Sequence, residues 1–195
     1  MTADTPTVEI AIPPPSSADD TTLVAKLTSM INAVYSGAEV GIFKEGYQRT
    51  HDAEVADFLR AGRIAVAVAV AVATSTSTST PHVEPVGCVS VKLLTPEKGE
   101  FGMMALAPEL RGHGLGTKLV LFAEDYCRAK GCTIMQLELL VPSTFAHEGK
   151  LRNQAWYLRM GYEIVRLGDF RDDYPALEPL LCGPTEYRVF EKRLA

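Results

Sequence analysis

The stretch Arg111-Gly112-His113-Gly114-Leu115-Gly116-Thr117 places three glycines at alternate positions directly before an amphipathic segment. Apolar residues then recur at helical spacing as far as a basic end at Lys130-Gly131, which predicts a helix of about four turns. Glycines leave backbone N–H groups uncovered, and the positive end of the helix dipole points the same way. The stretch is therefore predicted to be an anion-binding loop, with phosphate as the usual occupant.

Two common phosphate-binding motifs do not fit this spacing. A dinucleotide fingerprint needs a glycine where Thr117 stands. A Walker A motif needs a glycine directly before its Lys-Ser/Thr pair, whereas Thr117 precedes Lys118 here. A glycine-rich helix start without a ligand is the simpler interpretation of an isolated loop, so the surrounding elements must decide.

Composition indicates one soluble globular domain over residues 1–195. The chain has 47% apolar and 22% charged residues, and it is long enough for one sizeable core. A formal charge of −5 argues against nucleic acid as a partner, because proteins that bind it usually present a basic face. The sequence shows neither a basic-plus-apolar leader nor an apolar run of membrane-spanning length. We therefore expect no membrane partner and a cytoplasmic location, with the nucleus as an alternative.

The cysteines form no metal-binding pattern. Cys88, Cys127, Cys132 and Cys182 include no Cys-x-x-Cys pair, and two of them adjoin apolar periodic segments. We expect reduced core thiols, with neither a metal site nor a disulfide.

Hydrophobic periodicity and turn residues give the order of the elements. Strands are predicted at residues 8–12, 64–73, 86–94, 100–107, 132–140, 162–167 and 185–194. Helices are predicted over 23–34, from a cap at Thr50 to 61, after the glycine loop, and over 151–160. Connections are predicted as a turn at 96–99, a solvated acidic loop at 169–173 and a flexible Ser/Thr loop at 74–80.

This order resembles the GNAT superfamily of N-acetyltransferases over nearly the whole chain. The glycine stretch is similar to the acyl-CoA pyrophosphate loop of that family, Arg/Gln-x-x-Gly-x-Gly/Ala, and it follows the predicted fourth strand as it does there. The segments 138–142 and 156–162, with His147 and Lys150 between them, resemble small-molecule-type members. The resemblance implies an α/β (α+β) fold with a mixed central sheet of about seven strands flanked by four helices. It also implies acetyl-CoA as co-substrate and no metal.

Cofactor-binding roles follow from the same resemblance. Backbone groups of Met104, Ala105 and Leu106 would run beside the pantetheine arm and receive the acetyl carbonyl. The pyrophosphate would be held by Arg111, Gly112, His113, Gly114, Leu115, Gly116 and Thr117. Lys150 stands where many members have an asparagine, and it is interpreted either as a contact to a CoA phosphate or as an exposed charge at a helix start.

Catalytic roles are implied for a tyrosine and two glutamates. Tyr157, four residues before Gly161, matches the tyrosine that faces the CoA sulfur, and a phenol can protonate the departing thiolate. Its alternative is a core aromatic. Glu100 lies where histone acetyltransferases have a general base, and Glu138 on the neighbouring strand is the rival. A chain of water molecules that accepts the proton in place of either glutamate is a further alternative. For His147, both an active-site role and a surface position stay open.

The sequence therefore predicts an acetyl-CoA-dependent N-acetyltransferase that acts on a primary amine of a small molecule. The alternatives are a protein-lysine acetyltransferase and a catalytically silent acyl-CoA-binding sensor or scaffold. The acceptor pocket is expected from the loop between residues 35 and 50 and the last two strands. Neither the acceptor nor the oligomeric state, for which a homodimer is one option, follows from the sequence.

Overall fold

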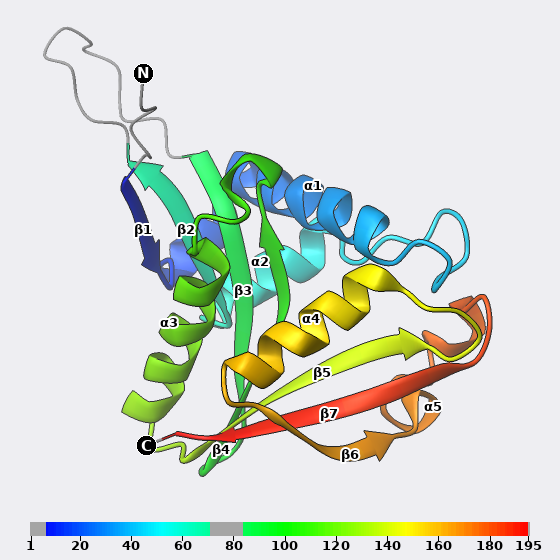
Figure 1. Ribbon diagram of the computed structural model, residues 1–195. Helices are drawn as coiled ribbons and strands as arrows, with labels where there is room; N and C mark the ends of the chain where they lie inside the picture. Colours follow the sequence, from blue (N-terminus) through cyan, green and yellow to red (C-terminus); the bar gives the residue numbers. More distant parts are fainter. Residues whose placement is uncertain (1–6, 71–83, 195) are drawn as a thin grey trace, which may run out of the picture.

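A mixed sheet in the order β1-β2-β3-β4-β5-β7-β6 runs through the computed structural model, which describes residues 7–70 and 84–194 (Figure 1). The strands are β1 (Thr7–Ala11), β2 (Ile64–Val70), β3 (Glu84–Thr95), β4 (Lys98–Leu106), β5 (Ile134–Pro142), β6 (Glu163–Gly168) and β7 (Thr185–Arg193). All neighbouring strands are antiparallel except β4 and β5, which are parallel. The predicted α/β fold with seven strands is confirmed. Residues 71–73 of the second predicted strand and the Ser/Thr loop at 74–80 lie outside the described residues.

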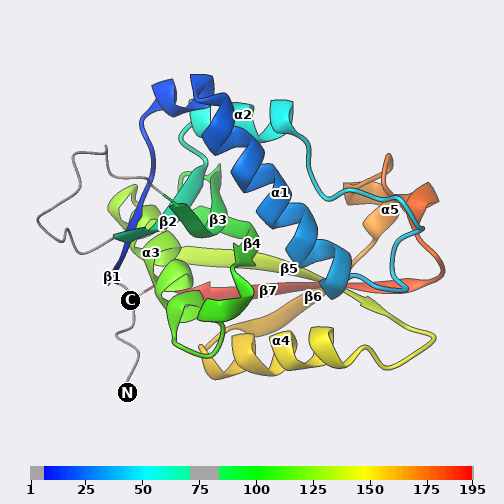
Figure 2. The same cartoon turned by 90° about the horizontal axis from the view of Figure 1, so that it is seen from above.

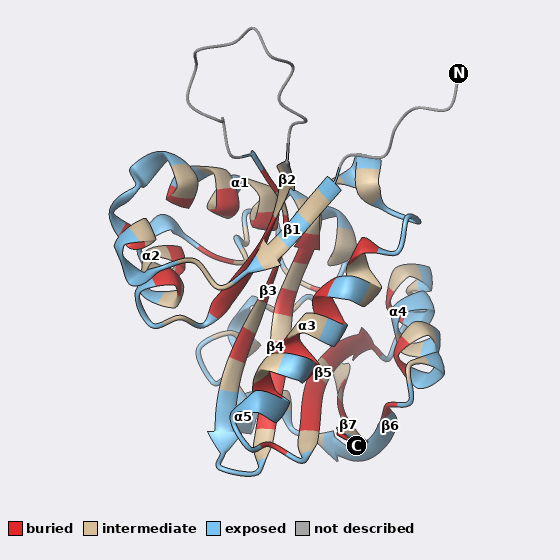
Figure 3. Cartoon of the chain, turned by 90° about the vertical axis from the view of Figure 1, so that its left-hand side faces the viewer, coloured by how far each residue is buried: buried red, intermediate tan, exposed pale blue. Residues whose placement is uncertain are grey.

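Helices cover both faces of this sheet (Figure 2). They are α1 (Thr21–Ala38), α2 (Asp52–Arg60), α3 (Leu115–Ala129), α4 (Glu148–Arg159) and the short α5 (Phe170–Asp173). The first two bury their apolar sides with β2, β3 and β4 in one core, while α3 and α4 pack on the opposite face. The most deeply buried residues therefore gather on the central strands and the inward sides of the helices (Figure 3).

Several predicted boundaries were wrong. The cap of α2 is His51, whose Nδ1 accepts from the Glu54 N–H at 3.1 Å, while Thr50 donates its hydroxyl to the Glu54 carboxylate at 2.6 Å. The turn before β4 is shorter than predicted, because the strand already begins at Lys98. The α4 helix begins at Glu148, one turn before its predicted start.

The acidic segment predicted to be a solvated loop is also different. Asp169 accepts a hydrogen bond from the Arg171 N–H at 2.9 Å and so caps α5, a single helical turn. This turn brings the rings of Phe170 and Tyr174 against Tyr187 of β7, at centroid distances of 5.7 and 5.8 Å. A fifth helix thus joins the predicted four, and it contributes to a small third core.

The cysteine prediction was right for three of the four residues. Cys88, Cys127 and Cys132 are buried free thiols, whereas Cys182 is free but exposed. Within residues 7–70 and 84–194, no cluster of His, Cys, Asp or Glu side chains is arranged to hold a metal ion. The helices of that same part are all too short or too polar to cross a membrane.

A buried ion pair links α3 to β7, and a tyrosine directly before β6 donates to its carboxylate. Glu124, 2% exposed, accepts from Lys192 Nζ at 2.9 Å and from the Tyr162 hydroxyl at 2.7 Å. A buried carboxylate needs each of these donors, because desolvation would otherwise disfavour its charge.

We expect Tyr162→Phe to lower the free energy of unfolding by about 1.5–3 kcal/mol, the usual contribution of a hydrogen bond to a charged group. Tyr126→Phe is the control, since Tyr126 is half-buried on the same helix as Glu124 and packs against the same core, while its hydroxyl makes no hydrogen bond with a described residue. Denaturant titration of both variants checks the prediction. Equal stability of Tyr162→Phe and the parent would show that the hydroxyl is dispensable.

Candidate active site

The central strands β4 and β5 diverge within the sheet. Their parallel ladder pairs only Lys98 with Ile134, Gly99 with Met135, and Glu100 with Gln136. Beyond these pairs β4 bonds only to β3 and β5 only to β7, and Figure 1 shows the two strands separating. Because no ladder joins residues 101–106 to 137–142, the facing edges retain backbone groups for a ligand.

A β-bulge lies in β4 at this divergence. Cys88 pairs with Ala105 and Ser90 with Gly102, so that Met103 and Met104 together oppose a single residue of β3. Met103 has a φ of 39°, in the left-handed region that L residues avoid at a cost of about 1–2 kcal/mol. Strain of this kind persists where the surrounding structure over-determines it, and it is common at functional sites.

The glycine loop leads from β4 into α3, as its sequence predicts. Gly112 and Gly114 both have a φ of 81°, and Gly114 is the N-cap of α3. No side chain caps this helix, so its first N–H groups face outward unsatisfied by protein. A Cβ on Gly116 would lie 3.3 Å from a methyl of Leu106 and 3.6 Å from Trp156, so even an alanine here would need a small shift of Leu106 and a larger side chain would push the helix away from the end of β4.

We expect Gly114→Val to weaken acetyl-CoA binding at least tenfold. A branched side chain disfavours the left-handed backbone and covers the N–H groups at the helix start. Gly131→Val is the matched control, because Gly131 has a φ of 96° at the other end of α3 and so carries similar backbone strain. Calorimetry on both variants checks this, and affinity of Gly114→Val within about threefold of the parent would make the loop a helix cap only.

Tyr157 projects from α4 toward the diverging strands. Its ring lies 6.0 Å from the ring of Phe101 on β4 and 6.0 Å from that of Phe190 on β7, and it is 8% exposed. Burial raises the pKa of Tyr157, so the phenol stays protonated at neutral pH. Its hydroxyl makes no hydrogen bond with any described residue, and it borders the cavity between the strands.

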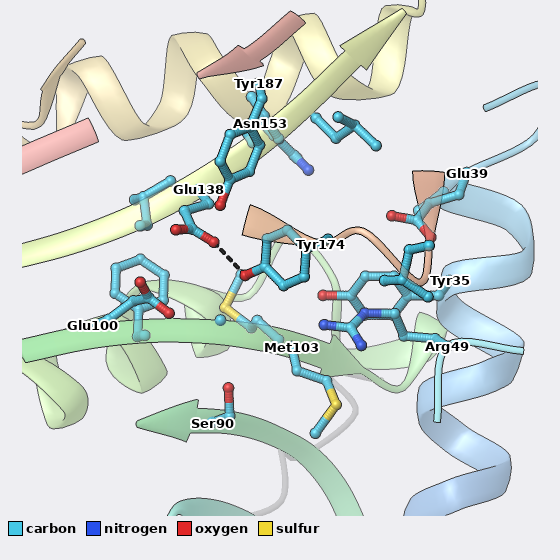
Figure 4. A pocket seen from close by; sticks show the side chains of 18 of the residues that line it. Tyr35, Glu39, Arg49, Ser90, Glu100, Met103, Glu138, Asn153, Tyr174 and Tyr187 are labelled. Atoms are coloured by element: carbon cyan, nitrogen blue, oxygen red, sulfur yellow. Dashed lines mark hydrogen bonds between the residues drawn. The ribbon is translucent and has the colours of Figure 1, made fainter. Parts of the chain in front are cut away.

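This cavity has a volume of about 390 Å³. Its base is formed by β4 and β5, and its walls by the end of α1, the loop that follows it, α4, and the segment after β6 (Figure 4). The segment 35–50, which covers the end of α1 and the loop after it, and one of the last two strands contribute as predicted, because Tyr35, Phe43 and Tyr187 line the cavity. The strand β6 itself does not, since the segment that follows it reaches the cavity in its place.

Glu138 of β5 faces the cavity as a carboxylate held by a tyrosine. The Tyr174 hydroxyl donates to it at 2.6 Å, and Gln136 Nε2 lies 3.4 Å from its other oxygen (Figure 4). Burial, and then Glu138 itself, raise the pKa of Tyr174, so the phenol remains a donor. The buried hydroxyl of Tyr187 points toward the same carboxylate but makes no hydrogen bond of good geometry with the described residues.

Glu100 of β4 also borders the cavity, but it is neutralised. Lys92 Nζ lies 2.7 Å from one of its oxygens, and Gln136 Nε2 donates to the other at 2.9 Å. Burial raises the pKa of this carboxyl group, and the hydrogen bond from Lys92 opposes the shift. The two glutamates are thus joined through Gln136, but only Glu100 has a cation beside it.

Comparison of the chain with models of protein families shows which family it belongs to. Residues 43–162 match the model of the acetyltransferase (GNAT) family. The chain belongs to the GNAT family. Its matched region includes the bulge, the glycine loop, Glu138 and Tyr157. The comparison with curated protein sequences found no significant match.

Solved structures share the GNAT fold at low sequence identity. A GNAT acetyltransferase from Staphylococcus aureus Mu50 is 14% identical with a TM-score of 0.63, over 97% of this chain and 100% of that one. The NatC complex bound to Gag peptide and CoA is 21% identical with a TM-score of 0.60, over 96% and 99%. N-acetylglutamate synthase from Neisseria gonorrhoeae, complexed with coenzyme A and N-acetyl-glutamate, is 17% identical with a TM-score of 0.57, over 99% of this chain but only 36% of the synthase.

Lys150 and His147, both named in the sequence analysis, make structural contacts within the chain. Lys150 is 6% exposed, and its Nζ lies 3.2 Å from Glu39 at the end of α1, so it is not the exposed charge that was the alternative. His147 caps α4, since its Nδ1 accepts from the Lys150 N–H at 3.3 Å. The GNAT cavity therefore contains Lys150 as half of an ion pair, while a contact to a CoA phosphate stays a prediction.

Sequence reasoning missed the residues that surround the two glutamates. Tyr174 directly follows the segment 169–173 that was predicted to be solvated, and no periodicity indicated that its hydroxyl meets Glu138. Lys92 follows the alternation of β3, yet its pairing with Glu100 depends on the register between β3 and β4. In that register Lys92 is the direct cross-strand partner of Glu100. Pairing the two predicted strands across their turn would have been the way to find this contact from the sequence.

Proposed function

We propose that this GNAT protein transfers an acetyl group from acetyl-CoA to a primary amine of a small molecule by direct attack on the thioester. The observation that carries the proposal is the divergence of β4 and β5. The glycine loop follows β4 and leads into α3, and the cavity opens between β4 and β5. Tyr157 of α4 borders this cavity. Coenzyme A is present in two of the similar structures, in agreement with this donor.

The donor fits the groups on this path. The pyrophosphate would lie on the N–H groups at the start of α3, around Gly112, Gly114 and Gly116. The pantetheine arm would follow the free edge of β4 at Met104, Ala105 and Leu106, and the bulge would direct a backbone N–H at the acetyl oxygen. The side chains of Arg111 and His113 flank the loop, with His113 Nδ1 3.0 Å from the Arg111 carbonyl.

The reaction then needs one proton acceptor and one proton donor. The amine nitrogen forms a bond to the acetyl carbon, and its proton goes to Glu138, directly or through a water. The C–S bond breaks, and Tyr157 gives its proton to the leaving sulfur. We assign the base to Glu138 and not Glu100, because Lys92 already neutralises Glu100.

A cavity of about 390 Å³ with aromatic walls favours a small acceptor over a protein side chain. A panel of amines assayed with acetyl-CoA by thiol release, with product mass as a second readout, tests the proposal. Acetylation of several small amines is the expected result. Acetylation of peptide lysines alone would favour a protein acetyltransferase, and CoA binding without thiol release across the panel would favour a silent acyl-CoA-binding domain.

A further inference from the structure

The acceptor cavity contains a guanidinium that has no carboxylate of the described residues within ion-pair distance. Two of the cations lining the cavity are paired, Lys92 with Glu100 at 2.7 Å and Lys150 with Glu39 at 3.2 Å. Arg49 lines the same cavity, yet no carboxylate of residues 7–70 or 84–194 lies within 4 Å of it. Glu39 and Glu54 act on this half-buried cation only from farther away, so a ligand carboxylate in direct contact with it would offset more of its desolvation.

The guanidinium of Arg49 lies over an aromatic ring. Its guanidinium carbon lies 5.3 Å from the ring centroid of Tyr35, near the end of α1. Burial raises the pKa of Tyr35 to about 12, so the phenol is neutral at physiological pH and does not cancel the charge of Arg49. Figure 4 shows the guanidinium at the edge of the open space, beside Tyr35 and above Met103.

The opposite side of the cavity carries the opposite charge. Glu138 has only the neutral Tyr174 hydroxyl and the Gln136 amide as partners, so its negative charge is also unpaired. In Figure 4 Glu138 and Arg49 lie on opposite sides of Tyr174. Glu39 and Glu100 are each paired with a lysine. Glu54 also lines the cavity, where it accepts a hydrogen bond from the Thr50 hydroxyl and acts on Arg49 from beyond ion-pair distance. Glu138 and Arg49 are therefore a carboxylate and a guanidinium of the same cavity that each have no direct partner of opposite charge among the described residues.

We propose that the acceptor is an amino carboxylate whose carboxylate binds Arg49 while its amine lies at Glu138. A planar guanidinium binds a carboxylate through two parallel hydrogen bonds, a geometry that no lysine in the cavity can supply. The inference rests on the proposed acetyl transfer and narrows its substrate class to amino acids and related zwitterions. The side chains of Met103 and Tyr174 would contact the carbon chain between the two charged groups.

Matched substrate pairs test this class. Each pair is an amino carboxylate and its neutral carboxamide, assayed by thiol release with saturating acetyl-CoA. The parent enzyme should prefer the acid in at least one pair by about 30-fold or more in kcat/KM, the range expected of a charge-assisted hydrogen-bond pair. Arg49→Gln should abolish this preference by raising KM for the acid while leaving the amide within about threefold. Arg49→Lys should retain part of it.

Arg63→Gln is the matched control, because Arg63 also lines the cavity but is exposed and lies 5.1 Å from the Phe58 ring. It should leave the ratio of acid to amide unchanged. Thermal melting of all three variants separates loss of recognition from loss of fold. Amides acetylated as well as acids by the parent enzyme, or a preference removed by Arg63→Gln and kept by Arg49→Gln, would overturn the inference. Acetylation of no amine at all would instead overturn the proposed function.

Discussion

The variant Tyr157→Phe should turn over about 10²–10⁴-fold more slowly than the parent enzyme, the usual contribution of a general acid. The substitution removes one hydroxyl and keeps the ring that packs against Phe101 and Phe190. Affinity for acetyl-CoA and the melting temperature should therefore hardly change. The loss should appear in kcat, with KM for acetyl-CoA little altered, because the proton is needed only as the thiolate departs.

Trp156→Phe is the control for this experiment. Trp156 lies beside Tyr157 with ring centroids 5.0 Å apart, and it contacts the start of α3 near Gly116. Its replacement should cost stability before it costs rate. Equal kcat for Tyr157→Phe and the parent, on a substrate whose chemical step limits turnover, would leave solvent as the proton donor.

Glu138→Gln should lower kcat/KM by about 10²–10⁴-fold near neutral pH, because the amide cannot accept the proton of the amine. The amide oxygen can still accept the hydrogen bond that Tyr174 donates at 2.6 Å, so the cavity should keep its shape. The deficit should shrink as pH rises through the pKa of the substrate ammonium, since the free amine then no longer needs a base. Initial rates across pH measure both effects.

Glu100→Gln is the matched comparison on the neighbouring strand. Its carboxylate is held by Lys92 and Gln136, so we expect its loss to change the rate less than about tenfold and to act on stability through the stranded Lys92. The reverse ranking of the two variants would assign the base to Glu100. Small effects in both would indicate that a water chain carries the proton.

Elements that depend on local chemistry were predictable from the sequence. The glycine loop is one, since Gly112 and Gly114 adopt the left-handed backbone that glycine permits and an amphipathic helix follows at once. The order of strands and helices is another, because periods of two and 3.6 residues are properties of short segments. One boundary error occurred where a capping side chain sets the first residue of a helix, since His51 and not Thr50 caps α2.

The charge state of the site required the tertiary structure. Lys92 neutralises Glu100 through the pairing of two strands, while Tyr174 meets Glu138 across 36 residues of sequence. Which of two glutamates is free to act as a base therefore depends on contacts that no local pattern encodes.

The sequence by itself predicted the family and the glycine loop before α3, because these depend on neighbours a few positions apart. Only the tertiary structure decided the divergence of β4 from β5 and the composition of the cavity. Lys150 meets Glu39 across 111 residues, and Arg49 lies beside Tyr35 with no carboxylate of the described residues within ion-pair distance. Charge pairing over such separations depends on how helices and loops pack against the sheet, and packing is a property of the whole fold.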